Sequence, residues 1–322
     1  MNNFVKSKKR ELVVVVAIVV MTLIFSVLNP SYFTGKNFLS ILQQATINGI
    51  LAVGMTYAIV SGGIDLSIGS TFAIVIVVVG QLTVAGVNPF IAILLGMILG
   101  AALGCVNGIL ITKMNLQPFI ATLGTMSVYR GIAYVITGGW PVLNIPDEFR
   151  SLLNTRISAL GNANVYLFVF LAVAIVAGII LSKTKFGNYI YAVGGNEEAA
   201  KLSGVNVHMT IIKAYAVTGV CAAVAGMIQL ASLGSGEPTA GSGYELDAIA
   251  AAAIGGTRMA GGKGTVLGTV FGAILLAALK IGLIVLNVDT FYQYIVTGII
   301  IIIAAYFEFI QERFAGMFSK KK

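Results

Sequence analysis

The sequence predicts an all-α, polytopic bundle of transmembrane helices with about ten spans, some of them broken or half-length, and with both termini in the cytoplasm. Of its 322 residues, 58% are hydrophobic and only 10% are charged. Soluble domains carry about 25% charged residues, so this composition is typical of membrane proteins. Long apolar runs recur along the whole chain, and the basic residues fall mainly in the breaks between them.

Ten apolar runs are long enough, or nearly long enough, to cross a hydrocarbon core of roughly 30 Å. The eighth run is short, and we expect a half-span that ends at the glycine-rich segment 255–264. The pattern predicts a cytoplasmic tail over residues 1–11, a transmembrane domain over 12–308 and a basic cytoplasmic tail over 309–322. The expected spans are 12–28, 39–60, 70–86, 89–112, 117–137, 165–182, 211–233, 246–257, 264–286 and 290–308.

The orientation follows from lysine and arginine, which are enriched in the cytoplasmic loops of membrane proteins. If the N-terminus is cytoplasmic, three of the 20 basic residues lie on the extracytoplasmic side: Lys36, Arg150 and Arg156. Two more, Arg130 and Lys280, lie within spans. The remaining 15 lie on the cytoplasmic side, an asymmetry that a shifted span count would spoil. Because the positive charge lies in these loops, the net charge of +8 indicates a membrane-lipid environment and no nucleic-acid partner.

Two segments between spans are long, 138–164 outside and 183–210 inside. Neither can hold a domain with its own core, which needs about 40 residues or more. The Gly-Gly-Lys-Gly run at 261–264 lacks the GxxxxGK[ST] spacing of an ATP-binding P-loop. With a single histidine and no catalytic or metal-ligand pattern, the chain is not expected to be an enzyme or to bind a cofactor.

Amide side chains interrupt the second expected span at Gln43, Gln44 and Asn48. Gln44 and Asn48 are four residues apart and share one helix face. Each amide offers both donors and an acceptor, which suits a ligand rich in hydroxyl groups. The same groups also suit hydrogen bonds between helices that hold the bundle together, and the sequence leaves both interpretations open.

The segment 61–70 breaks an otherwise continuous apolar stretch with glycines, serines and one acid. A helix break at membrane depth is tolerated only where protein or a cavity satisfies the freed backbone groups. Asp65 and Ser67 are therefore candidates for lining a solute path. The favoured alternative is that Asp65 caps the helix that follows.

Acidic and aromatic residues also lie at the start of the short eighth span, at Tyr244, Glu245 and Asp247. They are candidates for the same path, and the acids suit the N-terminus of a helix. Arg130 lies inside the fifth span and needs a carboxylate, carbonyl groups or water. We expect a structural pair of Arg130 with Asp65 or another acid, and the alternative is direct contact of Arg130 with a ligand. Lys280 is expected to extend toward a membrane edge.

Four long segments, in order along the chain, resemble the ribose-type permease subunits of bacterial ABC sugar importers, within the branched-chain amino acid/monosaccharide permease superfamily. The likeness runs from about residue 28 to 307. The matching segments are SGGIDLSIGS at 61–70, QPFIATLGTMSVYRG at 117–131, GNYIYAVGGNEEAAKLSGVNV at 187–207 and PTAGSGYELDAIAAAAIGGTRMAGGKGTVLGT at 238–269.

The resemblance implies a coupling element that docks on a cytoplasmic ATPase. The run EEAAKL is a strong helix former, preceded by a capping asparagine and ended by a glycine. The alternative is an interfacial helix without a partner. The residues that the resemblance assigns to coupling are Gly195, Asn196, Glu197, Glu198, Ala199, Ala200, Leu202 and Gly204.

The function that the resemblance implies is import of a monosaccharide across the bacterial plasma membrane, with ribose or another pentose as the expected substrate. The implied partners are an ATPase with tandem nucleotide-binding domains, which holds the ATP and Mg²⁺, an extracytoplasmic sugar-binding protein and a second permease copy. The alternatives are an ion-gradient-driven secondary transporter and an ABC importer of another small polar solute, such as galactose, an autoinducer or a nucleoside.

Overall fold

The computed structural model describes residues 2–158 and 163–289, together with 291–293, 295–296, 298–299 and 302–303. Eight long helices carry most of the fold: α1 Asn2–Leu28, α2 Gly35–Val60, α3 Ile68–Val84, α4 Pro89–Lys113, α5 Pro118–Thr137, α7 Val165–Lys183, α10 Val207–Leu233 and α12 Val266–Val285. The shorter elements are η1 Pro30–Tyr32, α6 Asp147–Asn154, α8 Lys185–Gly195, α9 Glu197–Leu202, α11 Tyr244–Ile254 and the strands β1 Arg156–Ile157 and β2 Ala163–Asn164.

The helices confirm the predicted all-α membrane bundle. Seven of those described are long and apolar enough to cross a bilayer, and α3 is a shorter apolar helix of 17 residues. The eighth expected span is a half-length helix, α11, of 11 residues. The tenth expected span, 290–308, and the tail 309–322 lie largely or wholly outside the described residues.

Several helices extend beyond their apolar runs because polar caps start them earlier. Thr34 accepts a hydrogen bond from the Asn37 amide, so α2 begins at Gly35, whereas the expected span starts at 39. Asn206 accepts one from the Met209 amide, so α10 begins at Val207. Such caps satisfy the first free N–H groups of a helix. At the N-terminus, α1 starts at Asn2, and the basic segment belongs to the same helix as the first span.

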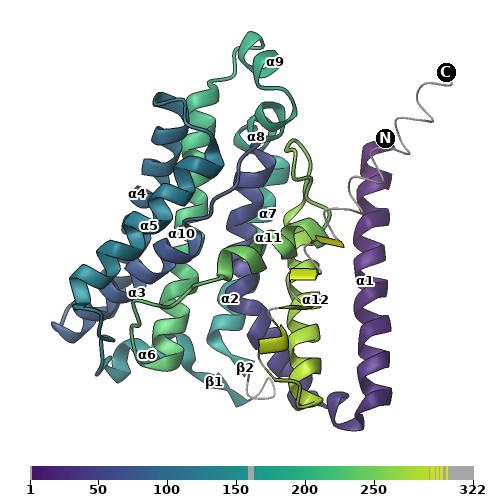
Figure 1. The fold of residues 1–322 in the computed structure, drawn as a ribbon, viewed down its shortest axis with the longest axis vertical. Helices are drawn as coiled ribbons and strands as arrows, with labels where there is room; N and C mark the ends of the chain where they lie inside the picture. Colours follow the sequence, from purple (N-terminus) through teal and green to yellow (C-terminus); the bar gives the residue numbers. More distant parts are fainter. Residues whose placement is uncertain are drawn as a thin grey trace.

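Figure 1 shows the long helices running roughly along one direction, with α9 at one end of the molecule and α6 and the β1–β2 hairpin at the other. We call these ends the α9 side and the α6 side. Helix α10 packs against α4, α2 and α3, and α1 stands at the edge against α12. The start of α1 lies on the α9 side, as expected if the N-terminus and the 183–210 segment share one side of the membrane.

The contact between α4 and α10 is made through glycines four residues apart. A Cβ at Gly100 would overlap the backbone of Gly219, and one at Gly104 would overlap the backbone of Tyr215. Small residues at this spacing let two helices approach closely, which drives association where no hydrophobic effect operates between them. The closely packed centre of the bundle therefore depends on residues without side chains.

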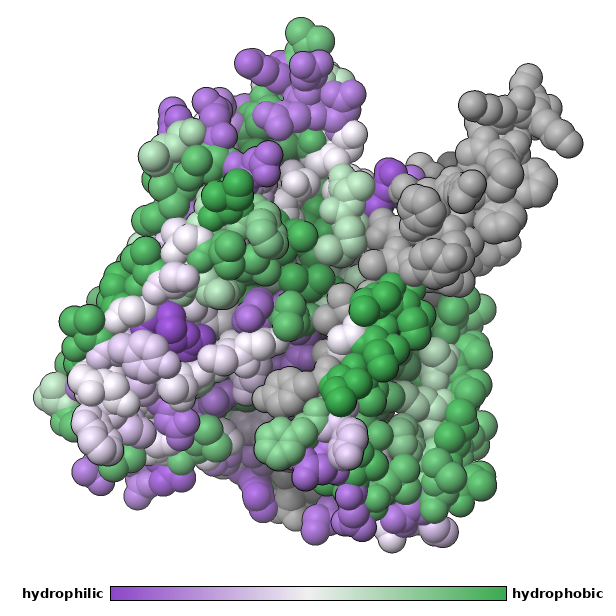
Figure 2. Space-filling view, viewed as in Figure 1, coloured by the Kyte–Doolittle hydropathy of each residue, from purple (hydrophilic) through white to green (hydrophobic). Residues whose placement is uncertain are grey.

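The outer surface of the bundle is apolar along its flanks. In Figure 2, hydrophilic residues gather over α9 and along the α6 side, and hydrophobic residues cover much of the surface between these ends. Large apolar side chains are exposed along α1, α4, α5 and α7. This distribution matches a hydrocarbon layer around the flanks and water at the two ends.

Candidate functional site

A polar stripe follows one face of α2 through Ser40, Gln44 and Asn48, which are spaced four residues apart. The N-terminal part of this stripe, Ser40 and Gln44, lines a cavity of about 220 Å³ among α2, α7 and α10 near the α6 side. One water occupies roughly 30 Å³ in the liquid, so the cavity has room for a small solute. Most of the lining side chains carry a hydroxyl or an amide; they are Ser40, Gln43, Gln44, Ile47, Tyr166, Ile228 and Ser232.

One turn further along α2, Asn48 joins an ion pair between α11 and α12. The Lys280 Nζ lies 2.6 Å from Asp247 Oδ2, and the Asn48 Nδ2 donates to the same oxygen at 3.2 Å. The pair is largely enclosed, with side-chain exposures of 17% for Lys280 and 10% for Asp247. The expectation that Lys280 extends to a membrane edge is wrong, because a carboxylate within reach offsets the cost of the charge inside the bundle.

Asp65 lies in a second polar cluster, where neutral groups satisfy it. Its Oδ1 accepts from the Ser67 amide at 2.9 Å and from the Ser67 hydroxyl at 2.6 Å. Asn107 on α4 donates its side-chain amide to the Ser67 hydroxyl at 2.7 Å, and the Thr125 hydroxyl on α5 donates to Asn107 Oδ1 at 2.7 Å. Asp65 is 1% exposed, so the cluster is closed to solvent in this conformation. Asp65 does not cap α3 as the favoured alternative expects, because the N-cap residue is Ser67 and it has no side-chain cap bond. Asp65 bonds Ser67 itself and so fixes the turn that precedes α3.

Arg130 is satisfied by carbonyl groups, and the expected ion pair with Asp65 is not formed. Its Nη1 donates to the carbonyls of Pro238 at 2.6 Å and Ala240 at 2.7 Å, and its Nη2 to that of Gly69 at 3.3 Å. Residues 234–243 connect α10 to α11 without forming a helix, so their carbonyls need donors at membrane depth. A guanidinium offers five N–H donors, so Arg130 can satisfy several of these carbonyls at once, which it could not do if its donors were used in an ion pair with an acid.

Tyr244 and Glu245 lie on the α3 and α10 side of α11. The Tyr244 hydroxyl donates to Gln229 Oε1 at 3.3 Å, and its ring packs edge-on against Phe72 at 5.5 Å between centroids. A Cβ at Gly69 would lie 2.7 Å from Glu245 Oε2. The structure therefore brings Asn48 and Asp247 together and groups Gln43 with Gln44, while Tyr244 and Glu245 form a separate contact at the start of α3.

Three residues of these clusters were missed by sequence reasoning: Asn107, Thr125 and Lys280 as an ion-pair partner. Asn107 is an amide inside an apolar run, the same signal that singled out Gln43, Gln44 and Asn48. Thr125 gives little signal, since threonine occurs throughout transmembrane helices and bonds its own backbone there.

The predicted coupling helix is present as α9, at the far end of the molecule (Figure 1). The Asn196 side chain accepts from the Ala199 amide at 2.9 Å, and Gly204 has a φ of +82°, so cap and stop occupy the predicted positions. Ala200 is buried and Leu202 is 89% exposed. The remaining residues assigned to coupling are Gly195, Glu197, Glu198 and Ala199, and all four are exposed.

Behind α9, a junction of close backbone contacts joins α8 to the transmembrane helices. A Cβ at Gly194 in α8 would overlap the carbonyl of Val60, the last residue of α2. The Gly262 amide donates to the same carbonyl at 2.9 Å, and the Tyr191 hydroxyl donates to the Gly264 carbonyl at 2.7 Å. Helix α8, which leads into α9, therefore contacts both the end of α2 and the loop before α12.

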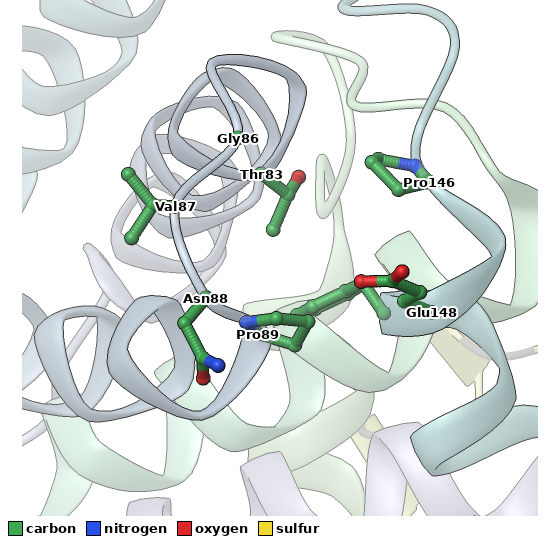
Figure 3. A pocket seen from close by; sticks show the side chains of 8 residues that line it. Thr83, Gly86, Val87, Asn88, Pro89, Pro146 and Glu148 are labelled. Atoms are coloured by element: carbon green, nitrogen blue, oxygen red, sulfur yellow. The ribbon is translucent and has the colours of Figure 1, made fainter.

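The α6 side carries a second cavity, of about 250 Å³, between the α3–α4 connection and α6. Figure 3 shows Pro89 and Glu148 at one edge of this cavity and Thr83 and Pro146 at the opposite edge. Glu148 is exposed, so the cavity presents a negative charge to the surroundings.

The chain matches the family described as "Branched-chain amino acid transport system / permease component" over residues 37–305. It belongs to this permease family. The ribose import permease protein of Bacillus subtilis (strain 168) is 43% identical over 285 residues, 88% of each chain. The ribose import permease protein of Escherichia coli (strain K12) is 42% identical over 312 residues, 94% of each chain.

Relatives named for other sugars are also similar. The D-allose permease protein of Escherichia coli (strain K12) is 39% identical over 87% of this permease, and the galactose/methyl galactoside permease protein of that strain is 36% identical over 92%. No solved structure matches. The family and the apolar helices confirm the predicted resemblance and the predicted multi-pass membrane location of this transport subunit.

Proposed function

We propose that this permease forms the membrane path of an ATP-driven ABC importer for a monosaccharide, with ribose as the first candidate. The observation that carries the proposal is the identity of 43% and 42% to two ribose import permeases over most of both chains. Identity is 39% for the allose relative and 36% for the galactose relative, below the 43% and 42% of these two ribose permeases, so these sugars rank after ribose.

The solute path runs along the polar stripe of α2. Gln43 and Gln44 line the cavity on the α6 side, and their amides suit sugar hydroxyls as donors and acceptors. Asn48 lies one turn deeper on the same face of α2 and donates a hydrogen bond to Asp247 of α11. We assign the enclosed residues Asp65 and Ser67, with Tyr244 and Glu245, to the broken-helix segments that border this path.

The ATPase docks on α9, and ATP with Mg²⁺ binds to that partner while this chain binds no cofactor. Helix α9 projects beyond the bundle with two acids, Glu197 and Glu198, in its first turn and an exposed leucine, Leu202, in its last. An exposed leucine flanked by charges is suited to a protein interface, because an interface has an apolar centre and a polar rim. The α9 side is then cytoplasmic.

The opposite, α6 side receives the sugar from an extracytoplasmic binding protein. The cavity beside Glu148 and the exposed α6 helix offer a recessed, charged surface for such a partner. A second copy of the permease completes the path, since Gln44 is exposed in a single copy although it lies within a transmembrane helix. A homodimer is the simplest assembly that covers this residue.

The test is uptake of labelled sugar into proteoliposomes that contain the permease with its cognate ATPase and binding protein, and ATP inside. Ribose, xylose, allose and galactose are tested in turn. Uptake that requires all three components and is fastest with ribose supports the proposal. Uptake by the permease alone, driven by an imposed ion gradient, contradicts it and indicates a secondary transporter. ATP-driven uptake that is fastest with another sugar corrects the substrate alone.

A further inference from the structure

The ion pair between Asp247 and Lys280 connects two helices that have no other charged contact among the described residues. Asp247 Oδ2 accepts from Lys280 at 2.6 Å and from Asn48 at 3.2 Å, so one carboxylate oxygen joins α11, α12 and α2. Charge-assisted bonds of this length are about twice as strong as bonds between neutral groups. The three helices thus meet at one strong, directional contact.

The rest of the α11–α12 contact is made by glycine and alanine residues without large side chains. A Cβ at Gly272 on α12 would overlap the carbonyl of Ala251, and Gly255 and Gly268 approach each other in the same way. Small residues allow close approach but provide few interlocking side chains. Helix α11 is also bounded by the non-helical segments 234–243 and 255–264, so neither neighbouring helix continues into it. Its position along α12 therefore depends strongly on the bonds of Asp247.

Each member of the pair requires the other. The turn of α12 that precedes Lys280 carries Ala277 and Ala278, which pack into an apolar cluster with Phe25 of α1 and Tyr32 of η1. An ammonium left alone in such surroundings is costly, and so is a carboxylate left alone in the first turn of α11. A shift of α11 along α12 must either carry Lys280 with it or separate two enclosed charges.

We propose that Asp247, Lys280 and Asn48 form a charge latch that positions the half-helix α11 on α12 and α2, so that the three helices move as one unit when the permease changes conformation. Asp247 and Lys280 are positioning residues in this scheme. The consequence for sugar uptake rests on the proposed function, whereas the position of α11 is measured without any solute.

The experiment places a single cysteine at the exposed Leu246, next to Asp247, after Cys105 and Cys221 are replaced by alanine. The rate of maleimide labelling at this cysteine then reports how tightly the first turn of α11 is held. In this background we compare the unchanged pair, Lys280→Arg and the doubly neutral variant Asp247→Asn/Lys280→Gln. Asp147→Asn, which alters the 97% exposed partner of a surface ion pair on α6, is the matched control.

We expect the doubly neutral variant to accumulate in the membrane, because it leaves no unpaired charge, and to label severalfold faster than the unchanged pair. Lys280→Arg and Asp147→Asn should label at the unchanged rate. In proteoliposomes with the ATPase and binding protein, the doubly neutral variant should import less sugar per ATP hydrolysed. This second measurement separates a latch from a purely structural pair.

An unchanged labelling rate in the doubly neutral variant would overturn the proposal. Faster labelling with unchanged uptake per ATP would overturn the claim that the helices move as one unit. If the unaltered permease imports no sugar with its ATPase, the proposed function fails, and the labelling rates still decide whether the pair holds α11.

Discussion

Asp65 and Asp247 are both buried in the bundle, and the protein surrounds their carboxyl groups in opposite ways. Asp65 accepts hydrogen bonds from Ser67 and from Asn107, all of them neutral donors, and is 1% exposed. Asp247 shares one oxygen between a lysine and an amide from two other helices, and its side chain is 10% exposed. The first carboxyl group fixes a local break between helices, and the second holds separate helices together.

The packing around the two carboxyl groups also differs, and it is tighter around Asp65. The 61–67 break that carries Asp65 is packed by backbone contacts, since Gly62 lies against Gly194. The region of Asp247 lies one turn from a polar cavity and has smooth, small-residue neighbours. The comparison indicates that rigidity is built into the α9 side of the bundle and that adjustable contacts gather toward its α6 side.

The largest effect is expected at the rigid junction, from Gly194→Ala. The new Cβ would overlap the Val60 carbonyl, and backbone atoms on both sides cannot move aside as a flexible side chain could. Overpacking typically costs about 1–3 kcal/mol and occasionally more, and we expect the upper end here because the overlapping atoms belong to the backbone. We expect little folded protein in the membrane and a lowered midpoint of thermal unfolding in detergent. Gly195→Ala is the matched control, because a Cβ there meets no atom within 4 Å; equal losses in both variants would contradict the prediction.

Asparagine at each of the two aspartate positions tests the comparison directly. Asp247→Asn leaves Lys280 without a counter-ion, and breaking an enclosed pair on one side costs about 3 kcal/mol. Asp65→Asn keeps an oxygen that accepts from Ser67, so the loss should be about 1 kcal/mol. Thermal unfolding of the two purified variants measures both. Equal destabilisation of the two variants would show that the neutral donors around Asp65 and the ion pair of Asp247 do not differ in their contribution to stability.

The sequence predicted the contacts that are local and missed those that are distant. Asn196 and the amide it caps are three residues apart, so capping rules identify this contact. Asp65 and its partner Ser67 are two residues apart, but Asp65 bonds the residue before α3 and does not cap the helix itself. Asp247 lies 33 residues from Lys280 and 199 from Asn48. Composition and charge placed these residues inside the membrane but could not pair them, because no local rule fixes which helices are neighbours.

The partners of Arg130 could not be predicted from the sequence either, and replacing Arg130 is a third test with a smaller expected effect on stability. Its carbonyl partners are 108 and 110 residues away, in the segment before α11. Arg130→Met removes the donors to Pro238, Ala240 and Gly69, and we expect a loss of about 2 kcal/mol, since bonds to charged groups contribute roughly 1.5–3 kcal/mol. Arg156→Met, at an exposed arginine, is the control and should change stability by less than about 0.5 kcal/mol. A thermal-unfolding midpoint unchanged in both variants would contradict the assigned role of Arg130.

The smallest effect on stability is expected on α9, where the effect on assembly should be large. Glu198 is exposed in the first turn of a helix of six residues, so Glu198→Arg should change the free energy of unfolding by less than about 0.5 kcal/mol. If α9 docks on an ATPase through charge complementarity, the reversed charge should abolish co-purification of that partner, because like charges facing each other across an interface are strongly unfavourable. Glu148→Arg, an equally exposed acid on the α6 side, is the matched control and should retain the ATPase. Recovery of the ATPase with both variants would remove α9 as its docking site, while loss with both would indicate that assembly depends on the net charge of the permease and not on one helix.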